Sequence, residues 1–269
     1  MKTPIVDCHC HIYPEKVAAK AVQGIGAFYD VPMCEDGTKA TLCRETKEAG
    51  ITHSMIFSVA TKPAQVGSIN SFIADEVQSS EKTMTGLGTL HPDSEHLEDD
   101  VKQILALDLR GVKLHPDVQG FKIDDYRCLK IYELCEKYQL PVLLHTGDKR
   151  YDMSNPNRLR PICEIFEGLI VIAANLGGYS VWDEAVLQLR GFKNLYFDCS
   201  STMAFLPPEK TASIIRQYGA EQVVFGTDYP MWSPKGEVER FYALNLTPEE
   251  NELILWKNAQ RLFRLEQVS

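Results

Sequence analysis

Short apolar runs with the composition of strands alternate with longer stretches of helical period along nearly the whole chain. Eight such runs occur, at residues 4–12, 51–59, 84–90, 110–115, 141–147, 169–178, 194–200 and 222–230. The interior runs are almost continuously apolar, which is typical of parallel strands that are buried on both faces. The pattern therefore predicts eight parallel strands, with helices between them.

The stretches between these runs carry the spacing of amphipathic helices. Residues 124–140 are one example, with apolar residues on one helical face. Residues 247–265 are another, and they begin with the N-cap pattern Thr-Pro-Glu-Glu. Eight β–α units within 269 residues fit a (β/α)8 barrel of the TIM type better than an open doubly wound sheet. We predict a single α/β domain over residues 1–269.

Composition and charge exclude several classes of partner. A net charge of −9 argues against binding to nucleic acid or to an anionic membrane surface. No apolar run approaches the roughly 20 residues that span a bilayer, and the N-terminus lacks the pattern of a signal peptide. Eight cysteines without a CxxC pair indicate reduced thiols, and thus a cytoplasmic protein. Since Cys8 and Cys10 alternate with two histidines, we expect them to face away from those histidines.

Polar residues gather where the predicted strands end, and in a (β/α)8 barrel the active site is built at that rim. His9 and His11 lie two residues apart in one strand, so both side chains should point to the same face. The other polar residues near strand ends are His91, Lys113, His115, His145, Asn175, Asp198 and Asp228. We therefore expect the site of chemistry among these residues.

Imidazole and carboxylate ligands at this rim predict a metal site. His9, His11, His145 and Asp228 would supply three nitrogens and one oxygen, a set that suits zinc and other borderline divalent metals. One divalent metal is expected, zinc in the first place, with manganese, iron, cobalt or nickel as alternatives. Such a metal would lower the pKa of a bound water from about 15.7 toward 7.

Five segments, DCHCH, GVKLHP, LLHTG, NLGG and GTDYP, occur in that order between Val6 and Tyr229. Together they resemble the amidohydrolase superfamily, and in particular the amidohydrolase-2 group. That group includes aminocarboxymuconate-semialdehyde decarboxylase, resorcylate-type decarboxylases and lactone hydrolases. The resemblance implies a distorted (β/α)8 barrel with one divalent metal, usually zinc, and it carries the ligand role to His9, His11, His145 and Asp228.

One position departs from the family pattern. The family typically has histidine where this chain has Asn175, and that histidine is expected to orient or deprotonate water, or to protonate the substrate. Asparagine cannot exchange protons near neutral pH, although its amide can donate and accept hydrogen bonds. Either another group handles the proton, with Asp228, His115 and His91 as candidates, or the activity is altered or lost.

Lys113 should point to the same side as His115. Some amidohydrolases use a carboxylated lysine here to bridge two metals, but such sites normally also use the histidine that Asn175 replaces. We therefore favour one metal, with Lys113 as an ammonium group that holds a substrate anion; pairing with a neighbouring acid is the alternative.

The loop at residues 146–162 follows the fifth predicted strand, and its cations could recognise a substrate carboxylate. The substrate contacts predicted there are Lys149, Arg150, Tyr151 and Arg158, and His91 is predicted from the rim. A solvated charged loop is the alternative. Tyr179 and Trp182 are candidate walls of the site, Asp198 is a candidate partner for a metal-binding histidine, and His53 and His96 are expected to be structural or surface residues.

These observations predict a metal-dependent hydrolase. A hydroxide on the metal would attack the carbonyl of an amide, lactone or ester in a small, carboxylate-bearing substrate. A non-oxidative carboxy-lyase with the same metal site is one alternative, and a metal-bearing binding protein, impaired because Asn175 replaces the usual histidine, is the other. The expected partner is a small molecule, with no nucleic acid and no membrane, and the sequence leaves a homo-oligomer open.

Overall fold

A computed structural model describes residues 3–265 and contains parallel strands at all eight predicted positions. The strands are β1 (Val6–His11), β2 (His53–Phe57), β3 (Met84–Gly86), β4 (Gly88–Thr89), β5 (Val112–Leu114), β6 (Val142–Leu144), β7 (Val171–Ala173), β8 (Leu195–Asp198) and β9 (Val223–Val224). The third predicted strand is divided into β3 and β4, because its pairing partner changes at Leu87. β3 pairs with β2, whereas β4 pairs with β5.

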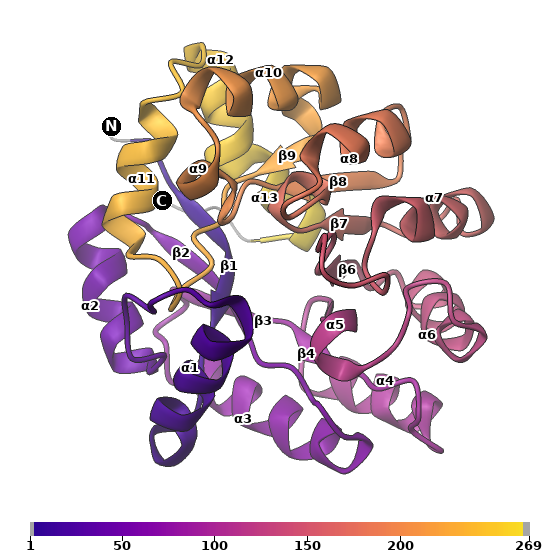
Figure 1. The fold of residues 1–269 in the computed structure, drawn as a ribbon. Coiled ribbons are helices and arrows are strands. Elements are labelled where there is room, and N and C mark those ends of the chain that lie inside the picture. The colour runs from indigo at the N-terminus through magenta and orange to yellow at the C-terminus, as the bar shows by residue number, and fades with distance from the viewer. Residues whose placement is uncertain (1–2, 266–269) are drawn as a thin grey trace.

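The strands follow one another around a barrel in the order of the sequence. One sheet has the order β1-β2-β3 and the other runs from β4 to β9 without a crossover. The Cys8 N–H donates to the Phe225 carbonyl at 2.9 Å, and the His11 N–H donates to the Tyr229 carbonyl at 2.8 Å. These bonds bring the first strand beside the segment that follows the last one. Figure 1 shows the helices arranged around these strands, as predicted for a TIM-type (β/α)8 barrel.

The helices that connect the strands lie outside the barrel (Figure 1). The α-helices are α1 (Glu15–Tyr29), α2 (Lys39–Ala49), α3 (Val66–Gln78), α4 (Leu97–Ala106), α5 (Pro116–Gln119), α6 (Tyr126–Lys137), α7 (Pro156–Ile165), α8 (Trp182–Leu189), α9 (Thr202–Phe205), α10 (Pro208–Tyr218), α11 (Pro234–Tyr242), α12 (Pro248–Glu252) and α13 (Asn258–Phe263). Shorter turns are η1 (Pro63–Gln65), η2 (Asn175–Gly177), η3 (Ala220–Gln222) and the π-turn η4 (Leu253–Lys257).

The last predicted helical stretch is present as α12, η4 and α13 in direct succession. Its capping box is also present, because the Thr247 hydroxyl accepts from the Glu250 N–H and the Glu250 carboxylate accepts from the Thr247 N–H. Two reciprocal bonds of this kind satisfy backbone donors that a helix start leaves unpaired. Among the described residues, no helix combines the length and apolarity that crossing a membrane requires.

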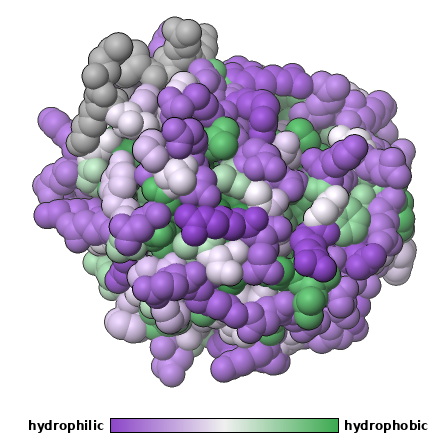
Figure 2. Space-filling view, turned by 90° about the horizontal axis from the view of Figure 1, so that it is seen from above, coloured by the Kyte–Doolittle hydropathy of each residue, from purple (hydrophilic) through white to green (hydrophobic). Residues whose placement is uncertain are grey.

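Two buried apolar clusters make up the core. The larger one lies between the strands and the surrounding helices, and the smaller one fills the barrel interior with residues such as Met55, Leu143 and Ile172. Leu262 and Phe263 of α13 belong to the interior cluster, so this helix covers one end of the barrel. The polar site therefore lies at the opposite end. The outer surface is mostly hydrophilic on the face in Figure 2, with its apolar residues in separate patches.

The prediction that Cys8 and Cys10 both face away from the histidines is wrong for Cys8. Cys10 packs in the outer cluster, whereas Cys8 packs in the interior cluster together with Val6. The register of β1 against β2 shifts between Asp7 and Cys10, and this irregularity interrupts the alternation of side chains. Both cysteines are fully buried.

Candidate metal centre

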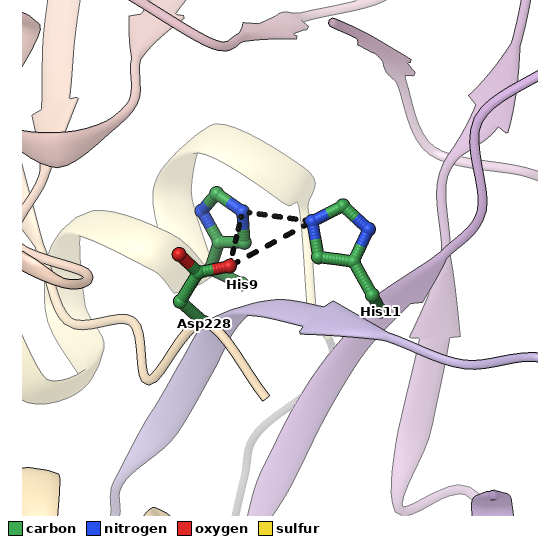
Figure 3. A group of neighbouring side chains, drawn as sticks. All are labelled: His9, His11 and Asp228. Carbon is green, nitrogen blue, oxygen red and sulfur yellow. Dashed lines mark hydrogen bonds and ion pairs between the residues drawn. The ribbon is translucent and has the colours of Figure 1, made fainter. Parts of the chain in front are cut away.

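Three side chains converge at the rim of the barrel (Figure 3). His9 and His11 come from β1, and Asp228 follows β9 in the segment that pairs with β1 through Cys10 and Tyr229. The two Nε2 atoms lie 3.3 Å apart. The Asp228 Oδ1 atom lies 3.4 Å from the His9 Nε2 atom and 3.7 Å from the His11 Nε2 atom. We call His9, His11 and Asp228 the convergent group.

A buried network holds His9 in its orientation. The His9 Nδ1 atom lies 2.8 Å from an oxygen of Asp198 and 3.1 Å from the hydroxyl of Ser200. Burial by itself would raise the pKa of Asp198, but the contact with His9, the charge of Lys113 and the Ser200 hydroxyl outweigh it and lower the pKa to about 2. Asp198 is therefore a carboxylate that accepts the Nδ1 proton of His9 and directs the Nε2 atom toward His11 and Asp228. The sequence-based prediction of a supporting role for Asp198 agrees with this contact.

Asp228 is held in a similar way from its other side. The Ser201 hydroxyl donates to Asp228 Oδ2 at 2.6 Å and accepts from the Trp232 indole N–H at 2.9 Å. This leaves Oδ1 directed at the two histidines. Asn175, Ser201 and Asp228 all have a positive φ, between 55° and 60°. This conformation is costly for residues other than glycine, and it recurs where a site demands a particular side-chain direction.

The convergent group lines a narrow pocket together with other polar side chains. Among these are Tyr29, Lys113, His115, His145, Asn175 and Tyr179. The Lys113 Nζ atom lies 3.2 Å from the His9 Nε2 atom and 5.1 Å from the ring centre of Phe57. Burial lowers the pKa of Lys113 to about 8, although Asp198 and Asp228 act in the opposite direction. The same burial lowers the pKa of His11 and His145 well below the usual value, so both rings are neutral and can act as ligands.

His145 lies in this pocket, but its Nε2 atom faces a second set of groups. It lies 3.6 Å from Asp117 Oδ2 and 3.3 Å from the Tyr29 hydroxyl, which also contacts the His115 Nε2 atom at 2.8 Å. The rings of His115 and His145 are stacked, with centres 4.0 Å apart and planes 7° apart. We call His115, Asp117 and His145 the stacked group. The ligand atoms of the stacked group also lie within 4.8 Å of one another, so it is a second group that could hold a cation. The Tyr29 hydroxyl lies within hydrogen-bond distance of both Nε2 atoms and takes that position in this arrangement.

The convergent group fits a divalent metal. Its three ligand atoms lie within 4.8 Å of one another, and they combine neutral imidazole with carboxylate, as zinc and manganese sites do. Asp198 and the Ser201 hydroxyl supply the outer hydrogen bonds that metal ligands usually need. His145 lines the same pocket and stays the predicted fourth ligand.

Asn175 lies at the start of η2, directly after β7, and is buried. Its Nδ2 group donates to the Ser200 carbonyl at 3.0 Å and to the Ser200 hydroxyl at 3.1 Å. Its backbone N–H donates to Asp198 at 3.1 Å. Asn175 therefore joins the network that orients His9, while its Oδ1 atom is buried without a hydrogen-bond partner in the described residues.

The two arginines predicted as substrate contacts in the loop at residues 146–162 have partners within the protein, whereas Lys149 is exposed and does not line the pocket. Arg150 contacts both oxygens of Asp148 and donates to the Phe28 carbonyl at 2.6 Å. Arg158 binds Asp124 at 2.9 Å and also pairs with Asp152. Arg150, Tyr151, Arg158 and His91 are not among the lining residues of the pocket, nor is the candidate wall Trp182. Of the predicted substrate contacts, Lys113 does line the pocket. Among the described residues, no other lysine or arginine lines it.

Sequence reasoning missed several residues of the site. Tyr29 lies at the end of α1, away from any strand end, and nothing in the local sequence connects it with His115. Ser200 and Ser201 lie two and three residues after the end of β8, and their position after a strand was a usable signal. Asp117, two residues after His115, carried the same signal. His53 and His96, which we expected to be structural or surface residues, lie outside the pocket lining.

A family model described as amidohydrolase matches residues 6–265. A search of curated proteins finds no match. Among solved structures, an uncharacterised TIM-barrel protein from Bordetella bronchiseptica superposes with a TM-score of 0.79 at 22% identity, over 97% of this chain and 99% of that one. The neighbours at this level of identity show the fold.

Two further structures have named activities. A candidate 2-pyrone-4,6-dicarboxylic acid hydrolase from Pseudomonas putida has a TM-score of 0.69 at 17% identity, with 99% of each chain covered. A dihydroxybenzoic acid decarboxylase from Polaromonas, solved with bound manganese and the inhibitor 2-nitroresorcinol, has a TM-score of 0.74 at 14% identity, with 98% of each chain covered. Hydrolases and decarboxylases thus share this fold.

Proposed function

This chain belongs to the amidohydrolase family, and from that premise we propose that it is a metal-dependent hydrolase of an amide, ester or lactone in a small, carboxylate-bearing substrate. One observation carries the proposal: two imidazole nitrogens and a carboxylate oxygen converge at the barrel rim, beside a pocket. His9, His11 and Asp228 would hold one divalent metal, zinc in the first place, with His145 as the expected fourth ligand. When bound there, such a metal activates water and polarises a carbonyl.

Asp228 is the group best placed to accept a proton from the attacking water. Its Oδ2 atom receives the Ser201 hydroxyl, and its Oδ1 atom faces His9 and His11 at 3.4 Å and 3.7 Å. Asn175 cannot take a proton, so this work falls to the carboxylate. The carboxylate thus has two roles, as a ligand and as a proton acceptor.

Lys113 supplies the positive charge that a substrate carboxylate would need. It lines the pocket, with its Nζ atom 3.2 Å from the His9 Nε2 atom and 5.1 Å from the ring centre of Phe57. Arg150 and Arg158 are already paired with aspartates, so they add little net charge for a ligand. A substrate with one carboxylate close to the reacting carbonyl fits this single cation.

The test uses the purified protein after chelation and after reloading with zinc or manganese, on a panel of amides, esters and lactones. We expect turnover that depends on the metal. Asp228→Asn should lower turnover more than it lowers metal content, because the imidazoles still bind while the proton acceptor is lost. The control is Asp152→Asn, which changes an exposed carboxylate outside the pocket.

Two other results would replace the proposal. Release of carbon dioxide from hydroxybenzoates, without hydrolysis of the panel, would identify the protein as a carboxy-lyase; a buried ammonium beside a metal site also suits that reaction. Tight metal and ligand binding without any turnover would identify a binding protein. Equal losses of metal and turnover in Asp228→Asn would assign this carboxylate the ligand role alone.

A further inference from the structure

The orientation of the Asn175 side-chain amide is fixed by its neighbours. Its nitrogen lies 3.0 Å from the Ser200 carbonyl oxygen, an atom that can only accept a hydrogen bond. The group that faces Ser200 must therefore be the NH2 group. The second bond, to the Ser200 hydroxyl at 3.1 Å, uses the same nitrogen. The side-chain oxygen is left to point elsewhere.

That oxygen is a buried acceptor that lacks a donor. Asn175 is 1% exposed and lines the pocket, and its Oδ1 atom has no hydrogen-bond partner among residues 3–265. Buried polar atoms in folded proteins are nearly always paired, so an unpaired one at a pocket wall calls for an explanation. A donor that arrives with the ligand supplies one.

The acceptor is held rigidly and lies near the convergent group. The backbone N–H of Asn175 binds Asp198, and the hydroxyl of Ser200 lies 3.1 Å from the Nδ1 atom of His9. One serine thus separates the Asn175 amide from the first predicted metal ligand. A ligand group that bonds to Oδ1 would therefore lie next to the reacting centre.

We infer that Asn175 selects ligands that carry a hydrogen-bond donor, an N–H or an O–H, beside the group that reacts. The inference rests on the proposed function for its reaction, and it narrows the substrate class to primary and secondary amides, lactams, and esters that carry a hydroxyl beside the reacting carbonyl. Lactones and simple esters have no donor at this position and leave the Oδ1 atom unpaired. A site built to bind a donor rejects the analogue that lacks it.

The test measures how strongly the protein prefers each donor-bearing ligand over a matched ligand without the donor. The pairs are N-acetylglycine with N-acetylsarcosine, pyroglutamate with N-methylpyroglutamate, and 2,6-dihydroxybenzoate with 2,6-dimethoxybenzoate, all of which carry a carboxylate. Dissociation constants and, where turnover occurs, kcat and KM are measured for the metal-loaded protein. The first two pairs probe an N–H donor, and the third probes an O–H donor.

The variant is Asn175→Gly, because glycine tolerates the φ of 58° at this position and removes the amide. Asn245→Gly is the matched control: it changes an exposed asparagine with a φ of 50° that does not line the pocket. We expect the parent protein and the control to prefer the donor ligand of at least one pair. Asn175→Gly should reduce that preference by roughly 2- to 13-fold, the ratio that one neutral hydrogen bond supplies.

The experiment distinguishes a failure of the donor preference from a failure of the proposed hydrolase function. A preference without turnover supports the role of Asn175 and removes the proposed hydrolase function. Turnover with no donor preference in the parent protein, or with the same preference in Asn175→Gly, overturns the inference and leaves the function standing. An equal loss of kcat for both members of every pair also overturns it, because Asn175 would then act on water. Loss of metal from Asn175→Gly, with the preference unchanged, would assign the residue to the support of His9 alone.

Discussion

The convergent group and the stacked group have the same composition, two histidines and one aspartate, but different geometry. The rings of His9 and His11 are tilted by 47° and their Nε2 atoms meet, whereas the rings of His115 and His145 lie 7° from parallel. The reason lies in the strands. His115 and His145 directly follow Leu114 and Leu144, which are paired neighbours in β5 and β6.

Neighbouring parallel strands are roughly 4.8 Å apart, so side chains at matching positions stack instead of converging. His9 and His11 share one strand, and Asp228 reaches them from the adjacent chain segment. Both groups bring their ligand atoms within 4.8 Å of one another, so distance alone does not separate them. In the stacked group the Tyr29 hydroxyl already contacts both Nε2 atoms, whereas the Nε2 atoms of the convergent group face each other and Asp228.

Replacing one histidine in each group should give the largest difference in metal affinity between the convergent group and the stacked group. We expect His11→Ala to lower metal affinity by more than about 100-fold, because a ligand contributes more than the outer partners, whose loss costs roughly 10- to 100-fold. His115→Ala, which also removes a buried imidazole from the pocket, should keep one equivalent of metal. Competition with a coloured chelator measures both affinities. Loss of the metal from His115→Ala would show that the stacked group takes part in binding.

The aspartates that support the two groups provide the next comparison. Asp198→Asn should lower metal affinity by roughly 10- to 100-fold, because His9 loses the carboxylate that fixes its Nδ1 proton. Asp117→Asn changes the carboxylate beside His145, the expected fourth ligand, and should lower the affinity less than Asp198→Asn does, because the support of the convergent group stays intact. Titration calorimetry measures the metal affinity of both variants. Equal losses would place both aspartates in one network.

His53, outside both groups, shows what a packed histidine without a site does. Its Nε2 atom lies 2.9 Å from the Thr85 hydroxyl, and burial lowers its pKa from 6.5 to about 4. The unfolded chain therefore binds the proton more readily, and the free energy of unfolding should fall by about 1–2 kcal/mol between pH 7 and pH 5. His53→Gln should remove this part of the pH dependence in urea unfolding. An unchanged slope would show that the pKa of His53 is not lowered in the folded protein.

The smallest effect is expected for the hydroxyl that bridges the stacked pair. Tyr29→Phe should lower the free energy of unfolding by about 1 kcal/mol, because two imidazole nitrogens lose a hydrogen-bond partner. Metal content should stay at one equivalent. Tyr179→Phe is the control, because Tyr179 lines the same pocket. Its hydroxyl has no hydrogen-bond partner among the described residues, so its removal breaks no such bond. A large drop in metal content for Tyr29→Phe would tie the two groups together.

The alternation of apolar and polar residues was sufficient to predict the barrel and its rim. Parallel strands buried on both faces produce continuous apolar runs, and a polar residue at the end of such a run stands out. His9 and His11 were predictable as a pair, because strand geometry sends residues i and i+2 to one face. The direction of the Cys8 side chain was not predictable from the sequence, because the irregularity in β1 depends on how β1 pairs with β2.

The sequence by itself therefore determined the positions and order of the strands, the polar rim and the shared direction of His9 and His11. Only the tertiary structure decided that His145 stacks on His115, that Arg150 and Arg158 are neutralised by nearby aspartates, and that Asn175 presents an oxygen instead of an N–H. The physical reason is the separation along the chain of the residues that each feature depends on. Hydrophobic periodicity is set by the local backbone, whereas lone-pair directions and ion pairing depend on which distant segments meet, as Ser200 meets Asn175.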